Sequence, residues 1–206
     1  MSILTTMSAC DKNEAPPATA EILYTMPEES EPHEGTWLQW PHHHQYGVAY
    51  RNSLDSTWVA ITKALVTSEK VHIIAYDQTE QNRITALLNT AGVALSNVDF
   101  KLYPTDDVWV RDNGPIYTKD KSGNLVIQDW GFNGWGQKTD DVSGLPIGFA
   151  QCNTIPAKIA ADQGRTLIEL NSKMTNEGGS VEIDGHGTLM ACKSSILNSN
   201  RNPGMT

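Results

Sequence analysis

The sequence contains few basic residues, few cysteines and no long apolar run. Its 206 residues include 15 Lys or Arg against 24 Asp or Glu, which gives a net charge of −9. That acidic balance argues against a nucleic-acid-binding protein, whose contact surface is usually basic. No segment approaches the roughly 18 consecutive apolar residues that a membrane helix needs, so we expect no membrane span.

Recognisable metal and cofactor motifs are also missing. The three cysteines, Cys10, Cys152 and Cys192, lack metal-ligand spacing and do not suggest a disulfide framework, and we expect Cys152 and Cys192 to be buried structural thiols. The phosphate-binding pattern Gly-x-Gly-x-x-Gly does not occur either. We therefore expect no cofactor and no metal. Hydrophobic residues make up 39% of the chain, with six Trp and six Tyr, which is enough to form a globular core.

The first 24 residues are predicted to be a leader and linker. Met1 to Cys10 is small and apolar up to the cysteine and then turns polar, like the end of a bacterial lipoprotein signal with Cys10 as the lipidated residue. It lacks the cationic start and the apolar run of about 7 to 15 residues of a complete signal. We expect a cytoplasmic protein, with an exported lipoprotein as the alternative.

From Met26 onward, short helices and strands are predicted to alternate. Apolar residues at helical spacing predict helices, and short apolar runs between turn residues predict strands and hairpins. The predicted helices are 52–67, 79–90 and 156–163; the predicted strands are 71–75, 98–103 and 166–170; the predicted hairpins are 115–118 with 125–128 and 180–183 with 188–191. This order indicates a mixed α/β fold, and the two hairpins suggest a repeated unit.

Four clusters of Trp, Asp and Glu stand out along the chain: Met26–Pro41, Asp107–Pro115, Trp130–Gly136 and Asn176–Ser180. Asp107–Pro115 is predicted to be a strand that runs into a turn. Carboxylates beside indoles suit a cationic organic ligand, because a carboxylate pairs with a planar guanidinium and an aromatic face attracts a cation. The alternative is structural, since Trp-rich segments also pack cores and an Arg-Asp pair also stabilises folds.

These clusters, in this order, resemble the agmatine deiminase family, part of the guanidine-modifying superfamily that also contains arginine deiminases. The matching motifs are Met-Pro-x-Glu-x-Glu-Pro-His-Glu-x-Thr-Trp-x-x-Trp-Pro (26–41), Asp-x-Trp-x-Arg-Asp-x-Gly-Pro (107–115), Phe-Asn-x-Trp-Gly (132–136), Glu-Gly-Gly (177–179) and a final stretch at 184–188 and 197–203. The resemblance identifies residues 25–206 as the N-terminal part of a deiminase catalytic domain. It implies an incomplete five-bladed α/β propeller of the pentein type, built of ββαβ repeats, with about three of the five units present.

The resemblance also implies an activity, the hydrolysis of a guanidinium to a ureido group and ammonia. In the family this reaction converts agmatine to N-carbamoylputrescine in putrescine biosynthesis, through an intermediate bound to a cysteine. By match to the motifs, Asp112 would hold the guanidinium and Glu177 would orient the catalytic histidine. Trp109 and Trp135 would line the channel for the aliphatic part of the substrate, whereas Arg111 would pair locally with acids such as Asp107.

The family's catalytic histidine and cysteine have no match in this sequence, and we expect the chain to be truncated before them. We expect His186 to be a hairpin residue and His42 to His44 to form a polar loop. Two alternatives remain open, namely a non-catalytic guanidinium or polyamine-binding fragment and an exported arginine or peptidyl-arginine deiminase relative. The expected partners are a small cationic guanidine such as agmatine and either a homo-oligomer or a completing C-terminal chain, with no nucleic acid.

Overall fold

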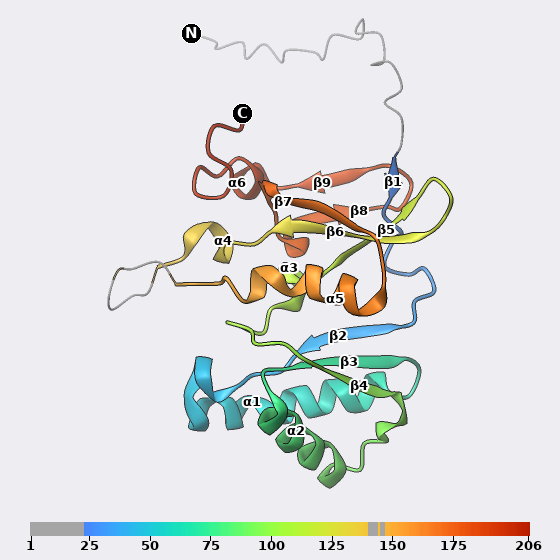
Figure 1. Cartoon of the computed structure of the whole chain (residues 1–206), viewed down its shortest axis with the longest axis vertical. Coiled ribbons are helices and arrows are strands. Elements are labelled where there is room, and N and C mark those ends of the chain that lie inside the picture. The colour runs from blue at the N-terminus through green and yellow to red at the C-terminus, as the bar shows by residue number, and fades with distance from the viewer. Residues whose placement is uncertain (1–22, 140–143, 145–146) are drawn as a thin grey trace, which may run out of the picture.

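A computed structural model describes residues 23–139, 144 and 147–206. The leader up to residue 22, and with it Cys10, lies outside the described residues. Three β-sheets follow one another along the long axis of the molecule (Figure 1). Within the described ranges, no helix combines the length and the apolar character that a bilayer crossing requires.

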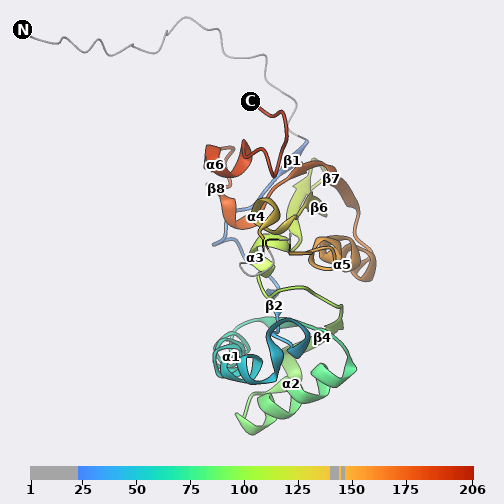
Figure 2. The same ribbon diagram turned by 90° about the vertical axis from the view of Figure 1, so that its left-hand side faces the viewer.

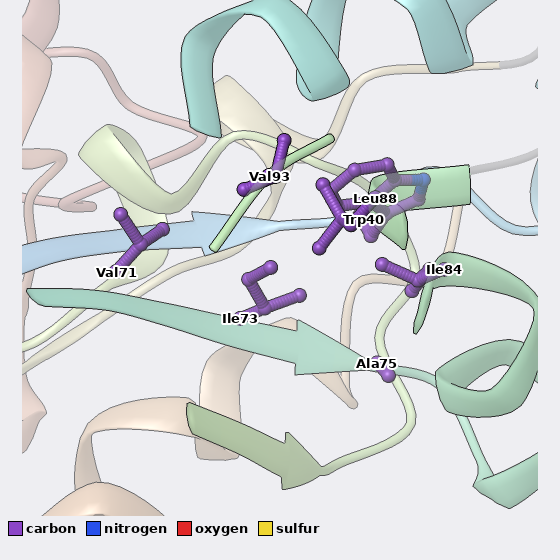
Figure 3. Close-up of a cluster of buried hydrophobic side chains, with 7 residues drawn as sticks. All are labelled: Trp40, Val71, Ile73, Ala75, Ile84, Leu88 and Val93. Atoms are coloured by element: carbon purple, nitrogen blue, oxygen red, sulfur yellow. The ribbon is translucent and has the colours of Figure 1, made fainter. Parts of the chain in front are cut away.

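The first sheet contains three parallel strands, β2 (Gly35–Gln39), β3 (Lys70–Ala75) and β4 (Val98–Leu102), in that order. Helices α1 (His43–Leu65) and α2 (Gln78–Thr90) pack beside it, and a short 3-10 helix, η1 (Leu95–Asn97), precedes β4. Buried side chains from β3, α2 and the loops meet in a common core (Figure 3): Trp40, Val71, Ile73, Ala75, Ile84, Leu88 and Val93. Burial of each large apolar side chain contributes about 1.5 to 3 kcal/mol.

The second sheet contains β1 (Tyr24–Thr25), β5 (Ile116–Asp120), β6 (Leu125–Gly131) and β7 (Leu167–Thr175). β5 and β6 form an antiparallel hairpin, and β7 pairs parallel to β6 after the crossover helix α5 (Ile155–Gln163). This ββαβ order is the repeating unit that the resemblance implies.

Helix α5 lies between the first and the second sheet (Figures 1 and 2). Its Ile155 and Ile159 share a buried cluster with Ile74 of β3 and Ile127 of β6. The helix therefore contributes to the packing of both sheets.

The remaining elements are short. α3 (Val110–Asn113) precedes β5, α4 (Gly134–Gln137) follows β6, and η2 (Cys152–Thr154) precedes α5. After β7 come η3 (Gly178–Ser180), the hairpin of β8 (Val181–Ile183) and β9 (Leu189–Ala191), and α6 (Lys193–Ile196). A cavity of about 720 Å³ separates this hairpin from the second sheet, with apolar side chains such as Ile116, Trp130 and Ile183 in its wall.

Three sequence-based expectations were wrong. The 107–115 segment contains the helix α3, over residues 110–113, and no strand. The three histidines do not form a polar loop, because α1 begins at His43. His42 is the N-cap of this helix and accepts a hydrogen bond from the backbone N–H of Gln45. Its side chain is buried, with 2% of the residue exposed. Cys192 is exposed at the start of α6, whereas Cys152 is buried as expected.

Candidate functional site

Asp112 lies on α3, and the glycines after Glu177 pack directly against that helix. A Cβ atom on Gly178 would approach the carbonyl oxygen of Arg111 to 2.5 Å, and one on Gly179 would approach Oδ1 of Asp112 to 2.3 Å. Such distances are impossible for real carbon atoms without a shift. The two glycines therefore allow the backbone beside Glu177 to contact α3 and to border the Asp112 carboxylate.

Gly179→Ala is expected to weaken binding of a ligand to Asp112 by about 10- to 100-fold, because displacing a functional group by about 1 Å has costs of that size. Calorimetric titration of agmatine into the wild type and the variant checks this expectation. Gly148→Ala is the matched control, since a Cβ there would meet nothing within 4 Å. Equal affinities for Gly179→Ala and Gly148→Ala would contradict the expectation.

Trp135 lies in a tight turn that we call the Trp135 turn (residues 133–136). Trp135 has a φ of 57°, in the left-handed region, and the backbone N–H of Gly136 donates a 3.0 Å hydrogen bond to Oδ1 of Asn133. The indole packs edge-on against Phe132 and Phe149, with ring centroids 5.1 and 5.4 Å away. These contacts hold the indole where it faces Asp112.

Glu177 is 2% exposed, and its charge is balanced within the protein. Arg201 donates a hydrogen bond of 2.7 Å from Nε to Oε1 of Glu177. Sequence reasoning assigned no role to Arg201, although it lies within the final stretch of the resemblance. The pairing is long-range, and nothing near Arg201 in the sequence indicates its partner.

The electrostatic environment of Asp112 differs from that of a surface carboxyl. Burial is the main reason that the pKa of Asp112 is raised above its usual range, and the nearby Glu177 raises it further. The Trp135 indole, the backbone amide of Gly179 and the charge of Arg111 favour the ionised form and limit the rise. Because Arg201 neutralises Glu177, the partly buried Asp112 carboxylate is the charge left to attract a cation from outside.

Trp109 precedes α3 and is 54% exposed, so it is accessible to a ligand instead of filling a core. Its carbonyl oxygen accepts a 2.8 Å hydrogen bond from Nδ2 of Asn113, which ties it to the helix that carries Asp112. The expectation for Arg111 was wrong in its partner. Arg111 pairs with Glu29 at 2.5 Å, and Asp107 accepts a hydrogen bond from Tyr46.

The two described thiols differ in their suitability as nucleophiles. Burial raises the pKa of Cys152 to about 11, so this thiol is protonated at neutral pH and unsuited to attack a carbon atom. Cys192 is exposed between β9 and α6. His186 lies exposed in the β8–β9 turn, where its backbone N–H donates to Asp184, as expected of a hairpin residue.

The structure thus brings Asp112, Trp135 and Glu177 together, with Trp109 beside the same helix. None of these four residues belongs to the wall of the 720 Å³ cavity. Across the described parts of the chain, no group of three or more His, Cys, Asp or Glu side chains could hold a metal ion.

Comparisons with known proteins point to one family. A family model described as Porphyromonas-type peptidyl-arginine deiminase matches residues 25–206. The agmatine deiminase of Pseudomonas aeruginosa (strain LESB58) is 32% identical over 180 residues, which cover 87% of this chain and 46% of that protein. The chain therefore spans about half the length of the curated relatives it matches.

Solved structures show the same likeness. One crystal structure, provisionally named agmatine deiminase, is 26% identical with a TM-score of 0.77 and covers 89% of this chain and 49% of its own. The agmatine deiminase of Enterococcus faecalis is 24% identical with a TM-score of 0.75, over 89% of this chain and 47% of its own. These likenesses confirm the predicted fold class, part of an α/β propeller of the pentein type.

Proposed function

The chain belongs to the Porphyromonas-type peptidyl-arginine deiminase family, and we propose that it is an agmatine deiminase-type hydrolase that acts on the C–N bond of a guanidinium group. One observation carries the proposal. The Asp112 carboxylate is partly buried, faces the Trp135 indole and lies beside the buried Glu177. That arrangement suits a flat organic cation.

Asp112 is the proposed guanidinium ligand. Its two oxygens can accept a pair of parallel N–H hydrogen bonds, the geometry in which carboxylates bind guanidinium groups most strongly. Binding requires the ionised form of the Asp112 carboxylate. Because the pKa of Asp112 is raised, this form is lost at a higher pH than in an ordinary aspartate, and binding should weaken there on acidification. Trp109 and Trp135 are the proposed contacts of the aliphatic part, where indole faces also attract a distal ammonium.

In the proposed reaction, a cysteine thiolate adds to the guanidinium carbon and ammonia leaves. A water molecule then adds to the same carbon and the thiolate leaves, which yields a ureido product. Glu177 is proposed to orient the histidine that moves the protons. Cys152 is buried and protonated, and the exposed Cys192 does not match the family's catalytic cysteine, so we place the nucleophile and this histidine outside the described residues.

Agmatine is the proposed substrate, since the Pseudomonas relative at 32% identity is an agmatine deiminase. Its two positive charges also suit a chain of net charge −9. The proposed product is N-carbamoylputrescine, a step in putrescine biosynthesis, and the proposed place of action is the cytoplasm. A second copy of the chain or a completing chain is the proposed protein partner.

Calorimetric titration of agmatine, followed by an assay for ammonia and ureido product, tests the proposal. We expect saturable binding of agmatine that is tighter than binding of arginine or of an arginine-containing peptide, and ammonia release by the catalytically complete protein. Tighter binding of the peptide would overturn agmatine as the substrate. Binding without ammonia release, in a preparation that contains the completing chain, would overturn the hydrolase in favour of a guanidinium-binding protein.

A further inference from the structure

Arg201 lies in a turn, residues 198–202, that is anchored to the end of β7. The side chain of Asn202 accepts a 2.8 Å hydrogen bond from the backbone N–H of Thr175 and donates a 2.9 Å bond to the Thr175 carbonyl oxygen. A second donation, also of 2.9 Å, reaches the carbonyl oxygen of Ile196. Asn202 is 6% exposed, so these bonds are shielded from water. The 198–202 turn is therefore held firmly beside the strand that leads to Glu177.

The same turn contacts the Trp135 turn. Nδ2 of Asn133 donates a 2.8 Å hydrogen bond to the carbonyl oxygen of Asn200. A Cβ atom on Gly136 would lie 3.2 Å from Oδ1 of Asn198 and 3.3 Å from Nη1 of Arg201. The guanidinium of Arg201 thus lies against the backbone that carries the Trp135 indole.

Arg201 and Glu177 form a nearly buried ion pair. Their side chains are 12% and 3% exposed, and Nε lies 2.7 Å from Oε1. A buried carboxylate without a partner is strongly unfavourable, so removing the arginine leaves a charge that the protein must neutralise or expose. The charge of Glu177 acts on Asp112 of α3, as does that of Arg111 on the same helix, and Arg111 is paired with the exposed Glu29.

We propose that Arg201 is a positioning residue, which holds the Glu177 carboxylate and the Trp135 turn in the arrangement that lets Asp112 bind a guanidinium. The inference rests on the proposed function. Arg201 balances the charge of Glu177, which leaves the charge of Asp112 for the ligand. Its contact with the Trp135 turn keeps the indole facing Asp112.

Replacement of Arg201 by methionine and by lysine tests this role. In Arg201→Met, the Glu177 carboxylate loses its internal cation and its negative charge acts unopposed on Asp112, so Asp112 binds a proton at higher pH. We expect the affinity for agmatine at pH 7 to fall by about tenfold or more. When the association constant is measured as a function of pH, the midpoint of its decrease on acidification should lie about one pH unit higher than in the wild type. Arg201→Lys should recover much of the affinity, because its ammonium restores the charge.

Arg165→Met is the control, since Arg165 is also partly buried but bonds Gln163 and Leu125, at the start of β6 and thus at the opposite end of that strand from the Trp135 turn. Its affinity and pH profile should equal those of the wild type. An unchanged affinity and pH profile in Arg201→Met would overturn the proposal. So would an Arg201→Lys variant that melts like the wild type but binds as weakly as Arg201→Met.

A measurement without ligand separates this proposal from the proposed function. In protein labelled with ¹⁵N-tryptophan, the indole resonance of Trp135 should respond to the ionisation of Asp112, and its titration midpoint should move in Arg201→Met but not in Arg165→Met. If the wild type fails to bind agmatine while this midpoint still moves, the proposed ligand is wrong and the positioning role stands. A midpoint that does not move overturns the positioning role.

Discussion

Asp112→Asn is expected to weaken agmatine binding by about 100-fold or more. Asparagine keeps the shape of the side chain but loses the charge that pairs with the guanidinium, and breaking a charge-assisted pair of this kind costs about 2 to 5 kcal/mol. Calorimetric titration of the variant at pH 7 measures the loss. Glu182→Gln is the matched control, because Glu182 is an exposed carboxylate on β8.

The same variant should be slightly more stable than the wild type at neutral pH. The folded protein raises the pKa of Asp112, mainly through burial, so the ionised carboxylate opposes folding above that pKa. As the pH falls, the folded wild type takes up this proton before the unfolded chain does, and the advantage of the variant should shrink. Thermal melting between pH 4 and 7 checks the sign. A destabilised variant that also fails to bind agmatine would show that Asp112 is structural.

Glu80→Ala is expected to lower the free energy of unfolding by about 3 to 5 kcal/mol, the usual cost of removing one partner from a buried ion pair. Glu80 is 1% exposed on α2 and lies 2.7 Å from both Arg51 and Arg83 and 2.9 Å from His43. Without it, two arginines lose their shared carboxylate. Urea denaturation of the variant measures the effect, and Glu182→Ala, on the exposed side of the β8–β9 hairpin, should change little.

The contribution of Glu80 should depend on pH in a defined direction. Burial works to raise the pKa of Glu80, but hydrogen bonds from His43 and Arg83, with the charges of Arg83 and Arg51, outweigh it and lower the pKa. Stability from Glu80 is therefore fully present above the ordinary glutamate value of 4.5 and is lost as the pH falls through the lowered value. A difference between wild type and Glu80→Ala that grows on acidification would contradict this assignment.

Much of the fold follows from local patterns. Helix α2 and strands β3 and β4 were predicted within a few residues, because their apolar spacing reports directly which face is buried. The two hairpins were predicted from turn residues between apolar runs. α1 was predicted too short, because it begins directly after the buried capping residue His42 and its axis bends at Gly47, where φ is 67°.

The site was less accessible to such reasoning. α3 is a single turn, and Gly178 and Gly179, which are distant in the sequence, pack against it. No local sequence pattern predicts this contact. Asp112, Trp135 and Glu177 were named through the resemblance to a family, and their spacing alone did not show that they meet. Charge pairs were the least predictable feature. Arg111 was assigned the wrong partner and Arg201 none, because the partner of a long side chain is decided by the folded chain.

The position of α5 has a consequence for the order in which the protein forms at the ribosome. The first sheet leaves the exit tunnel early, but its Ile74, together with Tyr103 directly after β4, is covered by a helix that is synthesised only after β6. During translation this surface stays exposed until Ile155 and Ile159 have emerged, and exposed apolar surface of this kind promotes misassembly and chaperone binding. The nascent chain is therefore prone to misassembly between the synthesis of β4 and that of α5, whereas in the folded protein this surface is covered.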